Sequence, residues 1–163
     1  MLEYIIENEL HQEGYALVCG VDEAGRGPLC GPVFAAACIL PDGLVLEGLN
    51  DSKKLTPKKR EKLFDLICEN AIDYCIASAS VEEIDELNIL EADLLAMRRA
   101  IDGLSEKADF ALIDGNIARD FQIPARAIIG GDLTTCNCKS PLLEIAVSFL
   151  ISCLSSFSSC SSL

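Results

Sequence analysis

The stretch ALVCGVDEAGRGPLCGPVFAAACIL, residues 16–40, decides the fold. It holds two apolar runs, 16–22 and 32–40, which we expect to be strands because glycine, proline and charged residues bound them. The first run ends in two adjacent acids, Asp22 and Glu23, and a Gly-Arg-Gly turn follows. Like charges at the end of a buried strand are costly, so this junction predicts a functional site rather than a plain connection.

Strands and helices alternate along the rest of the chain. Thr56 followed by Pro57 is a typical helix start, and Ser80 with Glu83 fits a capping box that opens one long helix over 81–101. This alternation predicts an α/β domain. The expected strands span 16–22, 32–40, 73–80, 108–115 and 124–132.

Composition limits the class of protein. The chain has 163 residues, which predicts one domain, and a net charge of −13, which argues against coating nucleic acid non-specifically. Nine cysteines at irregular spacing, without Cys-x-x-Cys and with a single histidine, His11, favour neither a disulfide framework nor a zinc site. We expect reduced thiols in a cytoplasmic monomer with no signal peptide and no membrane span.

Three expected strands end in acids, namely at Asp22 with Glu23, at Asp114 and at Asp132. Functional groups of α/β sheets gather where strands end, so these four carboxylates are candidates for one site. Carboxylate oxygens are hard ligands that suit two Mg²⁺ or Mn²⁺ ions, and two such ions together can promote phosphodiester hydrolysis. The alternative is that each acid is a solvated turn residue.

Two further features point to nucleic acid. Gly25 and Gly27 let the backbone around Arg26 approach a ligand closely, although a purely structural turn is the alternative. A dinucleotide-binding glycine loop fits less well, because strand rather than helix follows. Six of the thirteen cations fall within 53–62, beginning with Lys53 and Lys54, and form a candidate phosphate track or a solvated helix start.

Five motifs in order resemble ribonuclease HII, the type 2 ribonuclease H, over about residues 16–132. They are VDEAGRGPLCGPVFAAACIL, LNDSKKLTPKKRE, EIDELNILEADLLAMRRAI, LIDGN and IIGGD. The resemblance implies a ribonuclease H-like fold, with a central mixed sheet flanked by helices. It implies endonucleolytic hydrolysis of RNA in RNA–DNA hybrids and at ribonucleotides embedded in duplex DNA.

The resemblance also assigns roles to residues. Asp22, Glu23, Asp114 and Asp132 match the family's ligands for two Mg²⁺ or Mn²⁺ ions and are the expected catalytic residues. The backbone of Gly25, Arg26 and Gly27 matches the element that reads the ribose 2′-hydroxyl, the group that separates RNA from DNA. His11 lies before the first motif and receives no catalytic role.

The resemblance stops after Asp132. We expect a partial catalytic domain over 1–132 and a divergent Ser/Cys-rich segment over 133–163, helical to about 152 and disordered beyond it. The family's next helix and a later tyrosine have no counterpart, and a frameshift would account for the change. The alternatives to an active nuclease are a fragment that binds hybrids or a partner without cutting, and a nucleotide-binding module.

Overall fold

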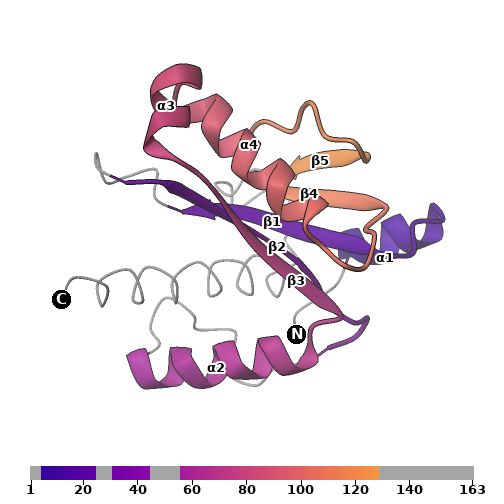
Figure 1. Ribbon diagram of the computed structural model, residues 1–163. Coiled ribbons are helices and arrows are strands. Elements are labelled where there is room, and N and C mark those ends of the chain that lie inside the picture. Colours follow the sequence, from indigo (N-terminus) through magenta and orange to yellow (C-terminus); the bar gives the residue numbers. More distant parts are fainter. Residues whose placement is uncertain (1–4, 25–30, 45–55, 129–163) are drawn as a thin grey trace, which may run out of the picture.

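A five-stranded mixed sheet forms the centre of the molecule (Figure 1), in the order β3-β2-β1-β4-β5. The computed structural model describes residues 5–24, 31–44 and 56–128. β1 pairs with β2 antiparallel and with β4 parallel, β3 pairs antiparallel with β2, and β5 lies parallel to β4. The strands are β1 Val18–Ala24, β2 Val33–Ile39, β3 Asp73–Ala79, β4 Phe110–Asp114 and β5 Ala125–Ile128. This sheet confirms the expected α/β class.

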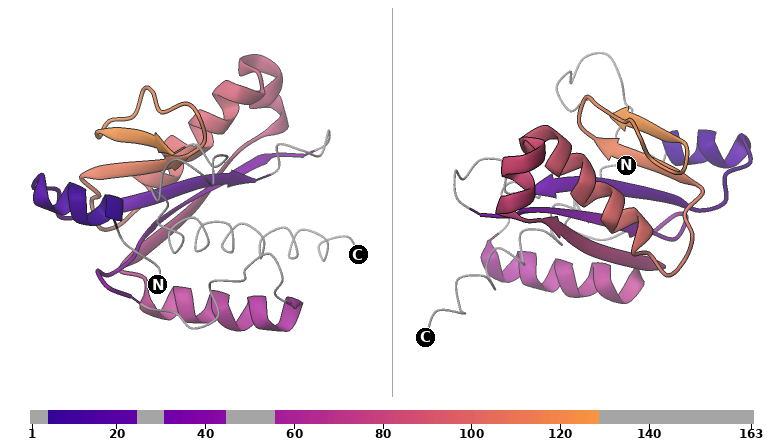
Figure 2. Two further views of the ribbon diagram at one scale, coloured as in Figure 1. Left: turned by 180° about the vertical axis from the view of Figure 1, so that it is seen from behind. Right: turned by 45° about the horizontal axis from the view of Figure 1, so that its top comes forward.

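Helices lie on both sides of the sheet. They are α1 Ile5–Gln12, α2 Pro57–Asn70, α3 Val81–Leu87 and α4 Ile89–Asp102. α4 crosses one face, and α2 lies on the opposite side, as both views of Figure 2 show. Ala92, Ala96 and Ala100 are fully buried on α4, and their small side chains let the helix pack closely on β1, β2 and β3.

The long helix expected over 81–101 is interrupted at Asn88. Asn88 has φ 78° and ψ 165°, so it ends α3 and begins α4 as its N-cap. The Asn88 side-chain oxygen accepts a hydrogen bond from the backbone N–H of Glu91 at 3.1 Å. The capping box between Ser80 and Glu83 is present as expected and begins α3.

Other parts of the structure differ from the expected elements or lie outside the described residues. α1 was not expected, and it buries Ile6 and Leu10. β1 extends two residues beyond the run 16–22 to Ala24, whereas β5 is described only to Ile128. The boundary at 132 and the tail 133–163 lie outside the described residues. Within the described ranges, no helix is both long enough and apolar enough to cross a membrane.

Candidate active site at the ends of β1 and β4

Asp22 and Asp114 lie at equivalent positions on neighbouring parallel strands. The register pairs Val18 with Phe110 and continues to Val21 with Ile113, and the two aspartates come next. Both side chains are half-buried. Since adjacent strands are ~4.8 Å apart, the structure brings two of the four predicted carboxylates together at one end of the sheet.

The predicted acidic residues of β1 and β4 do not all lie on the same face of the sheet. Val21 and Ile113 belong to the core beneath α4, so alternation along each strand directs Asp22 and Asp114 to the other face. Glu23 pairs with Ala35, a member of that core, and therefore belongs to the α4 face. β4 ends at Asp114, so the edge of β1 at Glu23 lies past the end of its parallel neighbour.

Asp109 joins the segments that lead into β1 and β4, the strands that carry Asp22 and Asp114. Its carboxylate accepts hydrogen bonds from the backbone N–H groups of Ala16 at 2.7 Å and Leu17 at 3.0 Å. The backbone N–H of Asp109 donates to the carbonyl of Leu17 at 2.9 Å. This two-way contact fixes the start of β1 against the start of β4. Sequence analysis missed Asp109, because the contact joins segments more than ninety residues apart.

The chain leaves β4 through a turn that depends on glycine. Gly115 has φ +143°, which side-chain-bearing residues rarely adopt. Its N–H donates to the carbonyl of Ile128 at 3.0 Å, which holds the end of β5 beside Asp114. Further along the same loop, Arg119 forms an ion pair with Glu91 in the first turn of α4. The loop that follows Asp114 is thus held to the sheet by Gly115 and to α4 by Arg119.

The remaining predicted site residues lie outside the described ranges: Gly25, Arg26, Gly27, Lys53, Lys54 and Asp132. The part of the basic segment that is described begins α2, where Lys58, Lys59 and Lys62 are exposed. α2 lies on the side of the sheet opposite α4, and Asp22 and Asp114 belong to the same side as α2 (Figures 1 and 2). The N-terminal end of α2 lies at the end of the sheet where β1 ends. The lysines and the two aspartates therefore share a side and an end of the molecule.

The donor set fits a hard divalent cation. Carboxylate oxygens are the ligands that Mg²⁺ and Mn²⁺ prefer, and two neighbouring carboxylates favour a cation between them. Within residues 5–24, 31–44 and 56–128, no group of three or more His, Cys, Asp or Glu side chains is close enough together to hold a metal ion. The fourth predicted ligand, Asp132, lies beyond those residues.

Comparison with known proteins gives one family. The family model Ribonuclease HII matches residues 19–149 and so continues past Asp132. A ribonuclease HII of Caldicellulosiruptor saccharolyticus is 47% identical over 153 residues, which are 93% of this chain and 75% of the relative. A ribonuclease HII of Burkholderia thailandensis is 59% identical over 116 residues, which are 71% of this chain and 54% of the relative. The chain thus spans about half the length of that second relative.

Solved structures agree on the fold. The ribonuclease H2 of Pyrococcus horikoshii aligns with a TM-score of 0.68 at 25% identity, over 87% of this chain and 73% of that one. The structure of Bst-RNase HIII in complex with Mn²⁺ aligns with a TM-score of 0.54 at 16% identity, over 87% of this chain and 54% of that one, and this likeness concerns the fold alone. The sheet order, the position of the acids at the strand ends and the family match over residues 19–149 lead to one conclusion: this chain belongs to the ribonuclease HII family.

Proposed function

We propose that the protein is an endonuclease that hydrolyses the RNA strand of RNA–DNA hybrids and cuts at ribonucleotides embedded in duplex DNA. One observation carries this proposal: Asp22 and Asp114 occupy neighbouring positions on one face, at the end of two parallel strands. Paired carboxylates at strand ends can hold the metal ions that promote phosphodiester hydrolysis. The family membership supplies the substrate class.

Asp22, Glu23, Asp114 and Asp132 are the proposed ligands of two Mg²⁺ or Mn²⁺ ions. Glu23 belongs to the α4 face, so its proposed contact with an ion passes the strand end, where β4 has stopped at Asp114. Bound cations would supply a more acidic water and would neutralise charge that develops on the phosphate. The protein's part is to hold the carboxylates. Asp109 fixes the strand register, and the Asp22 carboxylate accepts a hydrogen bond from the backbone N–H of Glu23 at 2.8 Å, which restricts its rotation.

We propose that the substrate duplex lies on the Asp22 and Asp114 side of the sheet. The backbone of Gly25, Arg26 and Gly27 follows β1 directly and is the proposed reader of the ribose 2′-hydroxyl. Lys53 and Lys54 are the proposed phosphate contacts near it. The exposed Lys58 and Lys59 support this path, because they add positive charge on the same side in a chain of net charge −13.

The cytoplasm is the proposed compartment. Cys19, Cys38, Cys68 and Cys75 are free thiols, as expected in reducing surroundings. Burial raises the pKa of the Cys19 and Cys38 thiols to about 12, so both behave as apolar core residues rather than as nucleophiles.

A cleavage assay tests the proposal. The substrate is a DNA duplex with one embedded ribonucleotide, incubated with the full chain and Mg²⁺ or Mn²⁺. We expect cutting beside the ribonucleotide that EDTA abolishes and that Asp22→Asn and Asp114→Asn each lower at least a hundredfold. Asp85→Asn is the matched control. Asp85 is exposed on α3, so this substitution removes the same charge at a position away from the site.

A binding measurement separates an active nuclease from a fragment that binds the duplex without cutting it. If the wild-type chain binds the duplex but does not cut it with either metal, the chain is a binding fragment and the proposal is wrong. Lys58→Gln combined with Lys59→Gln is expected to weaken duplex binding and to reduce its salt dependence. Lys107→Gln, an exposed lysine in the loop before β4, is the control for lost positive charge.

A further inference from the structure

His11 lies in the last turn of α1 and joins that helix to two other segments. Its Nδ1 lies 2.7 Å from the backbone carbonyl oxygen of Tyr15. Its Nε2 lies 2.8 Å from Oδ1 of Asp42, in the turn that follows β2. The imidazole therefore connects α1, the segment that leads into β1, and the turn after β2.

Both partners of the ring are acceptors. A backbone carbonyl only accepts, and a carboxylate only accepts when it is ionised, so each ring nitrogen must donate for both bonds to form. A neutral imidazole has one N–H and makes one of these bonds as a donor, whereas the imidazolium makes both. We propose that His11 is a proton-operated latch that, when doubly protonated, fastens α1 to the turn after β2.

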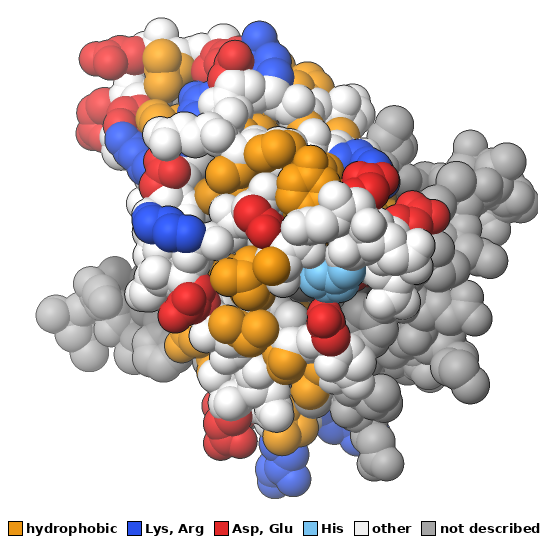
Figure 3. Space-filling view, turned by 90° about the vertical axis from the view of Figure 1, so that its right-hand side faces the viewer, with side chains coloured by type: hydrophobic (Ala, Val, Ile, Leu, Met, Phe, Trp, Pro, Cys, Tyr) orange, Lys and Arg blue, Asp and Glu red, His pale blue; other side chains and the backbone are white. Residues whose placement is uncertain are grey.

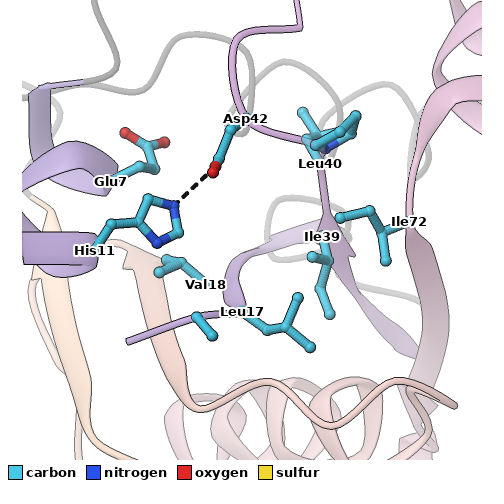
Figure 4. A pocket seen from close by; sticks show the side chains of 10 residues that line it. Glu7, His11, Leu17, Val18, Ile39, Leu40, Asp42 and Ile72 are labelled. Atoms are coloured by element: carbon cyan, nitrogen blue, oxygen red, sulfur yellow. Dashed lines mark hydrogen bonds and ion pairs between the residues drawn. The ribbon is translucent and has the colours of Figure 1, made fainter. Parts of the chain in front are cut away.

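The surroundings favour the imidazolium. His11 lines a pocket of about 150 Å³ together with the carboxylates of Glu7 and Asp42, as Figure 4 shows. These two acids are the titratable groups that share the described lining with His11. Leu17, Ile39 and Ile72 form apolar wall. In Figure 3 the histidine lies at the surface among acidic and hydrophobic side chains.

The hydrogen bond to the Tyr15 carbonyl is the largest cause that raises the pKa of His11 above its ordinary value of 6.5; burial opposes this rise, and the charge of Asp42 adds to it. At a pH below 6.5 the imidazole is therefore doubly protonated and the latch is closed. The latch opens as the pH rises through the raised pKa, because the folded state favours the charged form. The partial negative charge at the C-terminal end of α1 acts in the same direction.

The latch lies apart from the candidate active site. The pocket is lined by Val18, at the start of β1, and by Ile39, at the end of β2. Asp22 is four residues further along β1, or about 13 Å along the strand. The proposal therefore concerns how the N-terminal helix is attached, and a test that uses no cleavage can decide it.

Because the chain has one histidine, NMR of the imidazole reports on His11 without ambiguity. In the full chain we expect both ring nitrogens to be protonated near pH 6 and the titration midpoint to lie above 6.5. Amide exchange of α1, corrected for intrinsic rates and compared with β1, should become about fivefold faster across that midpoint, as the loss of one hydrogen bond predicts.

Two variants make the test specific. Asp42→Asn keeps an acceptor and removes the charge, so the His11 midpoint and the change in α1 exchange should both move to lower pH. His11→Gln should make the exchange of α1 independent of pH over the same range. Asp85→Asn, on α3, should change neither. A single protonated nitrogen at pH 6, a midpoint at or below 6.5, or α1 exchange that ignores the midpoint would overturn the proposal.

Discussion

Asp22 and Asp114 directly follow the last registered pair of β1 and β4, so two half-buried carboxylates stand side by side on one face of the sheet. Side-by-side like charges on neighbouring strands destabilise a sheet. A divalent cation removes this cost, because it binds the folded state and not the unfolded chain. We therefore expect the same two residues to affect both the stability and the metal affinity of the protein.

We predict that Asp114→Asn raises the melting temperature in EDTA and abolishes most of the stabilisation that Mn²⁺ gives the wild type. Thermal unfolding with and without Mn²⁺ measures both effects, and Asp22→Asn should behave alike. Asp85→Asn should respond to Mn²⁺ as the wild type does. Equal stabilisation of the wild type and Asp114→Asn by Mn²⁺ would show that the cation binds elsewhere.

A second prediction concerns Asp109, whose carboxylate accepts from two backbone N–H groups at the start of β1. Asp109→Asn leaves one acceptor oxygen for two donors, and the bond it loses is one to a charged group. We expect a loss of about 1.5–3 kcal/mol in the free energy of unfolding, measured with urea. Asp102→Asn, an exposed acid at the end of α4, is the control. No change in stability would mean that the strand register does not depend on Asp109.

A third prediction concerns Asn88. Its φ of 78° and ψ of 165° fall in a region that glycine occupies almost alone, and its side chain caps α4. Asn88→Ala should cost about 0.5–2 kcal/mol, because it loses the cap and keeps the strained backbone that Asn88 already bears. Asn88→Gly loses the cap but relieves the strain, so its cost should be near zero. Urea unfolding of the two variants measures the contrast, and equal costs would contradict the backbone argument.

Asn88 also shows why part of the fold escaped prediction. The apolar spacing from Ile84 to Ile101 is continuous, and neither glycine nor proline marks the break, so local sequence predicts one helix. The capping box of Ser80 and Glu83 was predictable because both partners lie within four residues. α1 escaped because eight residues give a weak periodic signal.

The candidate site divides in the same way. Residues at strand ends were predictable from local pattern, and Asp22 and Asp114 both follow the last registered pair of β1 and β4. The catalytic roles of these residues stay predictions. That Glu23 belongs to the opposite face follows from strand alternation and was open to prediction. The contacts of Asp109 and the ion pair of Arg119 with Glu91 were not, because they join segments distant in sequence.

A fourth prediction concerns the close approach of Gly103 to Cys75. A Cβ on Gly103 would lie 2.4 Å from the Cys75 Sγ and 3.1 Å from the carbonyl oxygen of Arg99, although the φ of −78° suits any residue. Gly103→Ala should therefore cost about 1–3 kcal/mol through overpacking. Cys75→Ala in the same chain removes the sulfur and should recover most of that loss.

A double-mutant cycle by urea unfolding measures this coupling. The expected result is that the combined variant is more stable than the sum of the two single changes predicts. Strict additivity would show that the sulfur is free to move aside and that the conflict lies with the backbone of Arg99.

The last prediction concerns pH and the ion pair between Glu83 and Arg99. The Glu83 carboxylate lies 2.6 Å and 2.8 Å from the two terminal guanidinium nitrogens of Arg99 and also accepts from the backbone N–H of Ser80 at 2.9 Å. The Arg99 hydrogen bonds, with the bond from Ser80, lower the pKa of Glu83 to about 2, against an ordinary 4.5. A lowered pKa means that the folded state binds this proton less readily than the unfolded chain does.

The contribution of Glu83 is therefore fully present above pH 4.5 and is lost as pH falls toward about 2. Glu83→Gln should be less stable than the wild type at pH 7, and the difference should shrink through that window. Because the pair joins α3 to α4 and is partly exposed, added salt should also reduce the difference. Glu86→Gln, an exposed neighbour on α3, should follow the wild type at every pH. A difference that stays constant from pH 7 to pH 2 would mean that Glu83 stabilises the helix start through shape and not through charge.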